Sequence, residues 1–117
     1  MADLLLDTDV LIDVLRGARR LAITGHRVTY SVITRAELFS GRAKDEEDVR
    51  VLLSPFRELG IDATIAERAG RLARSRVEMS DALIAATALE HGLELVTRNA
   101  RDFKEISGLR VRDPSTM

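Results

Sequence analysis

The stretch LLLDTDVLID, residues 4–13, leads an apolar run directly into a carboxylate and sets the beginning of the fold. The short apolar run over 3–6 is typical of a buried strand. Residues 8–17 have helical spacing, with Gly17 as a stop signal and one apolar stripe formed by Val10, Leu11, Val14 and Leu15. A buried strand that turns into a helix at Asp7 is therefore the first prediction.

Asp7 has three interpretations at this point. It is a solvated loop acid, a metal ligand at the end of a buried strand, or the nucleophile of a phosphatase. The last arises because the D-x-D pattern of Asp7 and Asp9 after an apolar strand also begins that chemistry. Asp13 falls on the side of the helix that we expect to face solvent. The positions of the other acids in the chain are needed to distinguish these three interpretations.

The composition is that of a globular protein with an aliphatic core. The chain has 117 residues, of which 45% are apolar and 3% aromatic, so we expect one domain over 1–117. The absence of cysteine excludes disulfides, thiolate metal sites and cysteine nucleophiles, and it favours a reducing cytoplasm. We expect neither a signal peptide nor a membrane segment. A net charge of −1 does not by itself indicate a polyanionic partner.

The basic residues are almost all arginine, because Lys44 and Lys104 are the only lysines among 18 basic side chains. Arginine suits bidentate contacts to phosphate. A GC-rich genome explains the same bias equally well.

Strands and helices alternate along the rest of the chain. Strands are expected at 27–31, 56–61, 93–97 and, at an edge, 109–113; helices are expected at 33–41, 43–54, 62–76, 80–92 and 100–106. Asp62 and Ser80 are the expected caps of their helices, and Gly92 is the expected stop of the helix before it. This alternation predicts an α/β fold with a mostly parallel sheet covered on both faces. Ligands of such sheets bind outside the carboxyl ends of the strands.

Four acids fall near that edge of the predicted sheet. Asp7 and Asp102 follow strands, Glu37 lies on the helix after the second strand, and Asp81 lies in the first turn of a nearly all-apolar helix. Carboxylates gathered in this way repel one another by roughly 1 kcal/mol in water and roughly 4 kcal/mol at an effective dielectric of 20, at about 4 Å. The cluster must therefore take up protons or bind cations, and hard divalent cations prefer oxygen ligands.

Each acid also has a purely structural interpretation. Asp7 could be a turn acid. Thr34 and Glu37 match a capping box, and Asp81 after Ser80 could simply complement a helix dipole. Asp102 alone is uninformative, so only the set of four argues for a site.

The segments LLLDTDVLID, ITRAELFSG (33–41) and SDALIAATALEHGLELVTRNARDF (80–103) resemble the PIN domain, and specifically the VapC-type toxin ribonucleases. The resemblance spans nearly the whole chain and implies a three-layer α/β/α fold with helices flanking the sheet. It implies that Asp7, Glu37 and Asp81 bind Mg2+ or Mn2+, with Asp102 as a more distant fourth acid acting through water. Thr8, Asp9, Thr97 and Asn99 are implied as supporting residues. The segment LARSRVEMSDA (72–82) is shorter than the usual link of the family, so we expect a distinct substrate groove there.

The resemblance also implies an activity and partners. Such toxins hydrolyse phosphodiester bonds of tRNA, ribosomal RNA or messenger RNA by attack of an activated water on phosphorus. They usually form homodimers, and heterotetramers or larger assemblies with a VapB-type antitoxin. The C-terminal segment of the antitoxin often places an arginine against the acidic site.

Other functions fit less well. A haloacid-dehalogenase-like phosphatase needs threonine or valine where Leu11 stands, and Lys104 is the only late lysine. A receiver domain lacks its lysine after the last strand. A catalytically degenerate PIN-like module that binds RNA or protein would not need all four acids. A PIN-type nuclease for single-stranded DNA stays open as an alternative.

Overall fold

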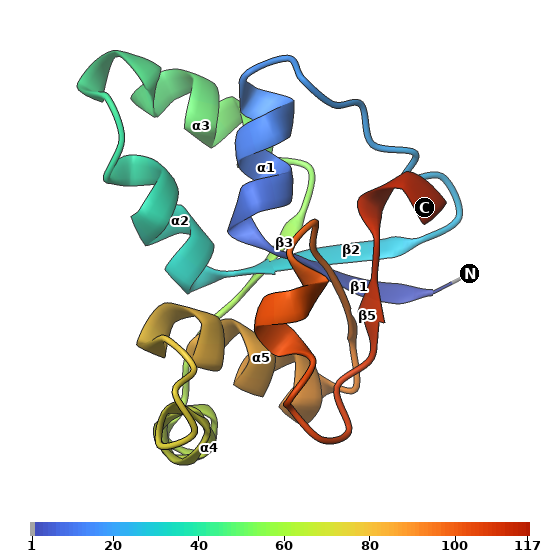
Figure 1. Cartoon of the computed structure of the whole chain (residues 1–117). Coiled ribbons are helices and arrows are strands. Elements are labelled where there is room, and N and C mark those ends of the chain that lie inside the picture. Colours follow the sequence, from blue (N-terminus) through green and yellow to red (C-terminus); the bar gives the residue numbers. More distant parts are fainter. Residues whose placement is uncertain (1) are drawn as a thin grey trace.

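The computed structural model describes residues 2–117 and contains a five-stranded sheet in the order β3-β2-β1-β4-β5, with every pairing parallel. The strands are β1 (Asp3–Leu6), β2 (Arg27–Ser31), β3 (Arg57–Leu59), β4 (Glu94–Val96) and β5 (Val111–Arg112). The order confirms the parallel α/β prediction and places β1 at the centre (Figure 1). Leu4, Leu5 and Leu6 are fully buried, as their apolar run requires.

Helices cover both faces of the sheet, so the three-layer architecture is confirmed. The helices are α1 (Thr8–Leu15), α2 (Val32–Phe39), α3 (Glu46–Leu53), α4 (Ala63–Ala73) and α5 (Met79–His91). Short 3-10 turns add η1 (Ala43–Asp45), η2 (Ala100–Phe103) and η3 (Pro114–Thr116). Figure 1 shows α1, α2 and α3 on one side of the sheet and α4 and α5 on the other.

The leucines of β1 divide between the two cores. Leu4 and Leu6 pack with Leu11 of α1 and Leu53 of α3 on one face, whereas Leu5 packs with α5 on the other. A strand buried on both faces needs a continuous apolar run rather than an alternating one. Within the described residues, no helix has both the length and the apolarity that crossing a membrane requires.

Several predicted boundaries were wrong by a turn or less. Helix α1 ends at Leu15 rather than at 17. Of the short helix predicted at 100–106, only Ala100–Phe103 is helical, as the 3-10 turn η2. The bonds from the Asp102 amide to the Asn99 carbonyl and from the Ile106 amide to the Phe103 carbonyl span three residues, which is the 3-10 spacing. Region 43–54 likewise divides into η1 and α3.

The predicted caps were right at one helix and wrong at another. Asp62 accepts a hydrogen bond from the Ile65 amide at 2.8 Å and caps α4 as predicted. Ser80 does not cap α5, because the helix already begins at Met79 and the Ala82 amide donates to the Glu78 carbonyl at 2.8 Å. Gly92 ends α5 in the left-handed conformation, with φ of 66°.

Candidate active site

The chain changes direction across the sheet between β1 and β4, and the candidate site lies at the carboxyl ends of these two strands. Strands β2 and β3 extend the sheet on one side of β1, whereas β4 and β5 extend it on the other. Parallel sheets place their ligands in the crevice at such a reversal. Asp7 follows β1 and Thr97 follows β4, and the Asp7 amide donates to the Val96 carbonyl at 2.9 Å. The two residues are thereby fixed side by side.

Thr97 connects the acids that follow β1. Its hydroxyl oxygen lies 2.8 Å from Oδ2 of Asp7, to which it donates, and 3.2 Å from Oδ2 of Asp9. The Asn99 amide donates to the Thr97 hydroxyl at 3.0 Å, and Nδ2 of Asn99 donates to Oδ2 of Asp9 at 2.6 Å. The structure thus gathers Asp9, Thr97 and Asn99 around Asp7, across about 90 residues of sequence.

Glu37 reaches the same crevice through Thr8. The Thr8 hydroxyl donates to Oε1 of Glu37 at 2.7 Å and lies 2.9 Å from the Thr34 hydroxyl. Since the single hydroxyl hydrogen of Thr8 points to Glu37, Thr34 must donate to Thr8. The capping-box interpretation of Thr34 and Glu37 is therefore wrong, and Ser31 caps α2 by accepting from the Ile33 amide at 3.1 Å.

Asp81 and Asp102 lie close enough to the acids after β1 and on α2 for their charges to interact. Asp81 lies half-buried in the first turn of α5, and Asp102 lies exposed in η2. Burial raises the pKa of Asp81 to about 6, and the charges of Asp102, Glu78, Glu37 and Asp9 add to the rise. The negative charges of Asp81, Glu37 and Asp9 therefore repel one another across the site.

Asp7 has the more strongly perturbed carboxyl group. It is 6% exposed, and burial together with the neighbouring Asp9 charge raises the pKa of Asp7 to about 7, despite hydrogen bonds from Thr97 and Thr8 that favour the ionised form. Burial also raises the pKa of Asp9. Burial and mutual repulsion therefore disfavour the ionised form of both carboxyl groups.

The residues at the crevice have the chemistry of a divalent-cation site. Every candidate ligand is a carboxylate oxygen, and Oδ1 of Asp9 is buried without a hydrogen-bond donor. Within residues 2–117, no three acidic or histidine side chains stand close enough together to enclose one ion. A cation held by these carboxylates would keep several of its waters, as Mg2+ does in proteins.

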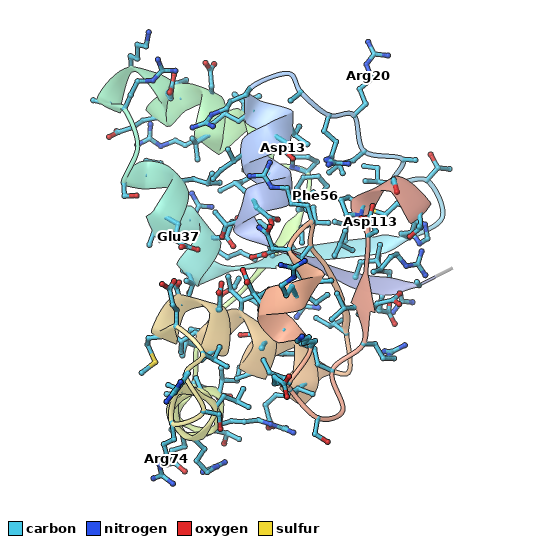
Figure 2. The ribbon with its side chains drawn as sticks, in the orientation of Figure 1. Asp13, Arg20, Glu37, Phe56, Arg74 and Asp113 are labelled. Carbon is cyan, nitrogen blue, oxygen red and sulfur yellow. The ribbon has the colours of Figure 1, made fainter. Side chains whose placement is uncertain are left out.

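Two residues near the crevice were missed or misread in the sequence. Asp13, expected in solvent, is 8% exposed and accepts from Nη1 of Arg98 at 2.7 Å and from Nη2 of Arg19 at 3.4 Å. Arg98 also lies 3.7 Å from Oδ2 of Asp9. Figure 2 shows Asp13 on α1, on the same helix that Asp7 caps. Only the position of Arg98 between Thr97 and Asn99 in the sequence hinted at this ion pair.

The sequence profile described as the PIN domain matches residues 4–109. The chain belongs to the PIN-domain family. It is 36% identical over 120 residues to Ribonuclease VapC10 of Mycobacterium tuberculosis, an alignment that covers 92% of this chain and 90% of that protein. It is 28% identical over 133 residues to the tRNA(fMet)-specific endonuclease VapC of Shigella flexneri, covering 97% and 98% of the two chains.

Solved structures share the fold of this PIN domain. A toxin–antitoxin complex from Klebsiella pneumoniae contains a chain that is 35% identical, with a TM-score of 0.75 and coverage of 94% of this chain and 96% of that one. DNA-bound VapBC from Salmonella typhimurium contains a chain that is 28% identical, with a TM-score of 0.79 and coverage of 97% and 98%. The family assignment removes the phosphatase and receiver interpretations.

Proposed function

We propose that this PIN domain, spanning 1–117, is a VapC-type toxin that hydrolyses RNA phosphodiester bonds with the help of a divalent cation. The observation that carries the proposal is the crevice between β1 and β4, where the buried Asp7 carboxylate faces other acids and its pKa rises to about 7. An enzyme that neutralises phosphate charge at a carboxylate cluster requires a cation. The ribonuclease relatives make RNA the substrate class that fits best.

Asp7, Glu37, Asp81 and Asp102 would hold Mg2+ or Mn2+, partly through water. When bound, such an ion neutralises charge on the phosphate and makes water a better nucleophile near neutral pH. Asp9 is a fifth candidate, because its Oδ1 is buried without a donor.

The polar residues of the crevice orient the acids. One oxygen of Asp7 accepts from the Thr8 amide at 2.8 Å and the other accepts from the Thr97 hydroxyl, so the plane of this carboxylate is fixed. Thr8 fixes Glu37 in the same way. Because both carboxylates are held in place before the substrate binds, little conformational entropy is lost when the transition state forms.

The antitoxin partner of this PIN domain is proposed from its structural neighbours, several of which are toxin–antitoxin complexes. A groove of about 550 Å3 runs between α1, α2 and η1, with Ile12, Leu15 and Leu38 as apolar walls and Glu37 at its margin. We assign the C-terminal segment of a VapB-type antitoxin to this groove, where an arginine would reach the acids. Homodimers, and heterotetramers or larger complexes with antitoxin, would form in the cytoplasm, where the tRNA, ribosomal RNA or messenger RNA substrate is present.

The test is cleavage of a total-RNA preparation by the purified chain with Mg2+, with Mn2+ or with EDTA. Cleavage that requires either cation and that stops when a VapB-type antitoxin is added supports the proposal. Cleavage that is equally fast in EDTA would overturn the cation requirement. A chain that binds RNA but never cleaves it with either cation would instead be the degenerate binding module.

A further inference from the structure

Residues 75–78, in the link between α4 and α5, form one wall of a second hollow near the candidate site. This hollow has a volume of about 470 Å3 and is also lined by residues of η2 and the turn after it. Figure 1 shows the link, in yellow, rising from α4 to the start of α5. Asp81 and Asp102, two of the four candidate acids, line this hollow, so a molecule bound in it contacts the acidic site.

Two arginines line the hollow without acidic partners. Arg76 comes from the link and Arg101 from η2, and both are exposed. Four acids line the same hollow, namely Glu78, Asp81, Asp102 and Glu105. In residues 2–117, neither arginine forms an ion pair, although Arg19, Arg35, Arg98 and others do. Both guanidinium groups therefore keep their donors available for a ligand.

The backbone at Arg76 is unusual. Its φ is 67°, and no other non-glycine residue among those described has a positive φ. A side chain with a β-carbon disfavours this conformation, and glycine adopts it readily. An arginine at a position that suits glycine indicates that its side chain contributes something other than backbone stability.

We propose that Arg76 and Arg101 bind a phosphate of the RNA next to the one that is cleaved, and so position the substrate across the acidic crevice. The inference rests on the proposed function and adds a substrate-binding subsite to it. A guanidinium donates two parallel hydrogen bonds to a phosphate, which fits the fork geometry of arginine. The acids of the hollow outnumber its two arginines, so a phosphate enters favourably only when a cation is bound beside Asp81.

The test measures binding of a fluorescein-labelled 12-nucleotide single-stranded RNA to the full chain in Ca2+, over a range of salt concentrations, with intact RNA verified by gel. The variant is Arg76→Gly combined with Arg101→Ala. Glycine suits the backbone at position 76, so this variant is expected to fold. The matched control, Arg20→Ala with Arg74→Ala, removes the same two charges from side chains that Figure 2 shows pointing away from the molecule.

The dissociation constant of the Arg76 and Arg101 variant should rise about tenfold or more. The slope of log K for association against log salt should become shallower by about 0.7, which corresponds to one lost phosphate contact on a single strand. The control should keep the wild-type slope. In Mg2+, KM should rise more than kcat falls, and Arg76→Lys with Arg101→Lys should recover part of the affinity.

Equal affinity and slope in the variant and in the wild type would overturn this subsite while leaving the proposed function intact. A control that loses as much affinity as the variant would also overturn it, because the effect would then be one of net charge. A wild-type chain that neither binds nor cleaves the RNA would overturn the proposed function, and the subsite with it.

Discussion

Asp7 is buried beside other acids, and its ionised carboxylate therefore destabilises the folded state. A rise in the pKa of Asp7 from 3.8 to about 7 corresponds to about 4 kcal/mol of unfavourable free energy in the ionised folded state. Thr97 and Thr8 donate hydrogen bonds to it, but these offset only part of the burial and of the repulsion by Asp9. Unfavourable carboxylates of this kind are common at functional sites, where a bound ligand or cation can compensate their charge.

The stability of the cation-free chain should therefore depend on pH through this residue. Because the folded pKa of Asp7 lies above its unfolded value, the folded state holds the proton more tightly between about pH 4 and pH 7. The contribution of Asp7 to stability is fully present below this range and is lost as pH rises through about 7. In EDTA at pH 8, Asp7→Asn should then be more stable than the wild type by about 1–4 kcal/mol, measured by urea unfolding.

Asp3→Asn serves as the control, because Asp3 is exposed at the opposite end of β1. It should follow the wild-type pH dependence. An Asp7→Asn variant that is less stable than the wild type at pH 8 would contradict this account of the carboxyl group.

The elements α1 and α2 meet at the relay from Thr34 through Thr8 to Glu37. Thr34 is fully buried and Thr8 is 7% exposed, so neither hydroxyl can replace a lost partner with bulk water. Thr8→Val keeps the shape of the side chain but leaves the Thr34 hydroxyl and one Glu37 oxygen without their partner. We expect a loss of about 1–3 kcal/mol in the free energy of unfolding and about tenfold slower RNA cleavage.

Thr8→Ser restores the hydroxyl and should recover most of both quantities. Equal activity of the valine and serine variants would show that the relay does not orient Glu37.

The ion pair between Arg98 and Asp13 ties α1 to the segment after β4. Asp13 is nearly buried while the Arg98 side chain is 48% exposed, so the pair is screened on one side only. A double-mutant cycle with Asp13→Asn and Arg98→Ala should give a coupling free energy of about 1–2 kcal/mol. The exposed pair of Arg27 and Asp3, with atoms 3.8 Å apart, should give less than about 0.5 kcal/mol. Similar coupling in both pairs would contradict a fixing role for Arg98.

At the scale of the whole molecule, the sequence was sufficient to place β1 and the acid that follows it. Three consecutive leucines require a strand buried on both faces, and parallel neighbours bring Asp7, Thr97 and Asn99 to one edge. These inferences depend on the local apolar pattern and on the alternation of strands and helices, and short segments of sequence are enough to show both.

Other features of the site depend on contacts between distant segments, so short patterns could not reveal them. The partner of Thr8 is Thr34, and the partner of Asp13 is 85 residues away. The start of α5 was misread because Ser80 is a good capping residue by type, whereas the backbone of the short link fixes the helix start at Met79. How closely the acids surround a cation is also set by side-chain rotamers, which no sequence pattern encodes.

The central claim is that the acids at the β1 and β4 crevice cleave RNA with a divalent cation, and one comparison tests it most directly. Cleavage of a 5′-labelled RNA is measured in Mg2+ at pH 8 for the wild type, Asp81→Asn and the control Asp3→Asn, with folding verified by circular dichroism. We predict that Asp81→Asn stays folded and cleaves at least about 100-fold more slowly, while Asp3→Asn cleaves like the wild type. A folded Asp81→Asn variant with wild-type cleavage would contradict the claim.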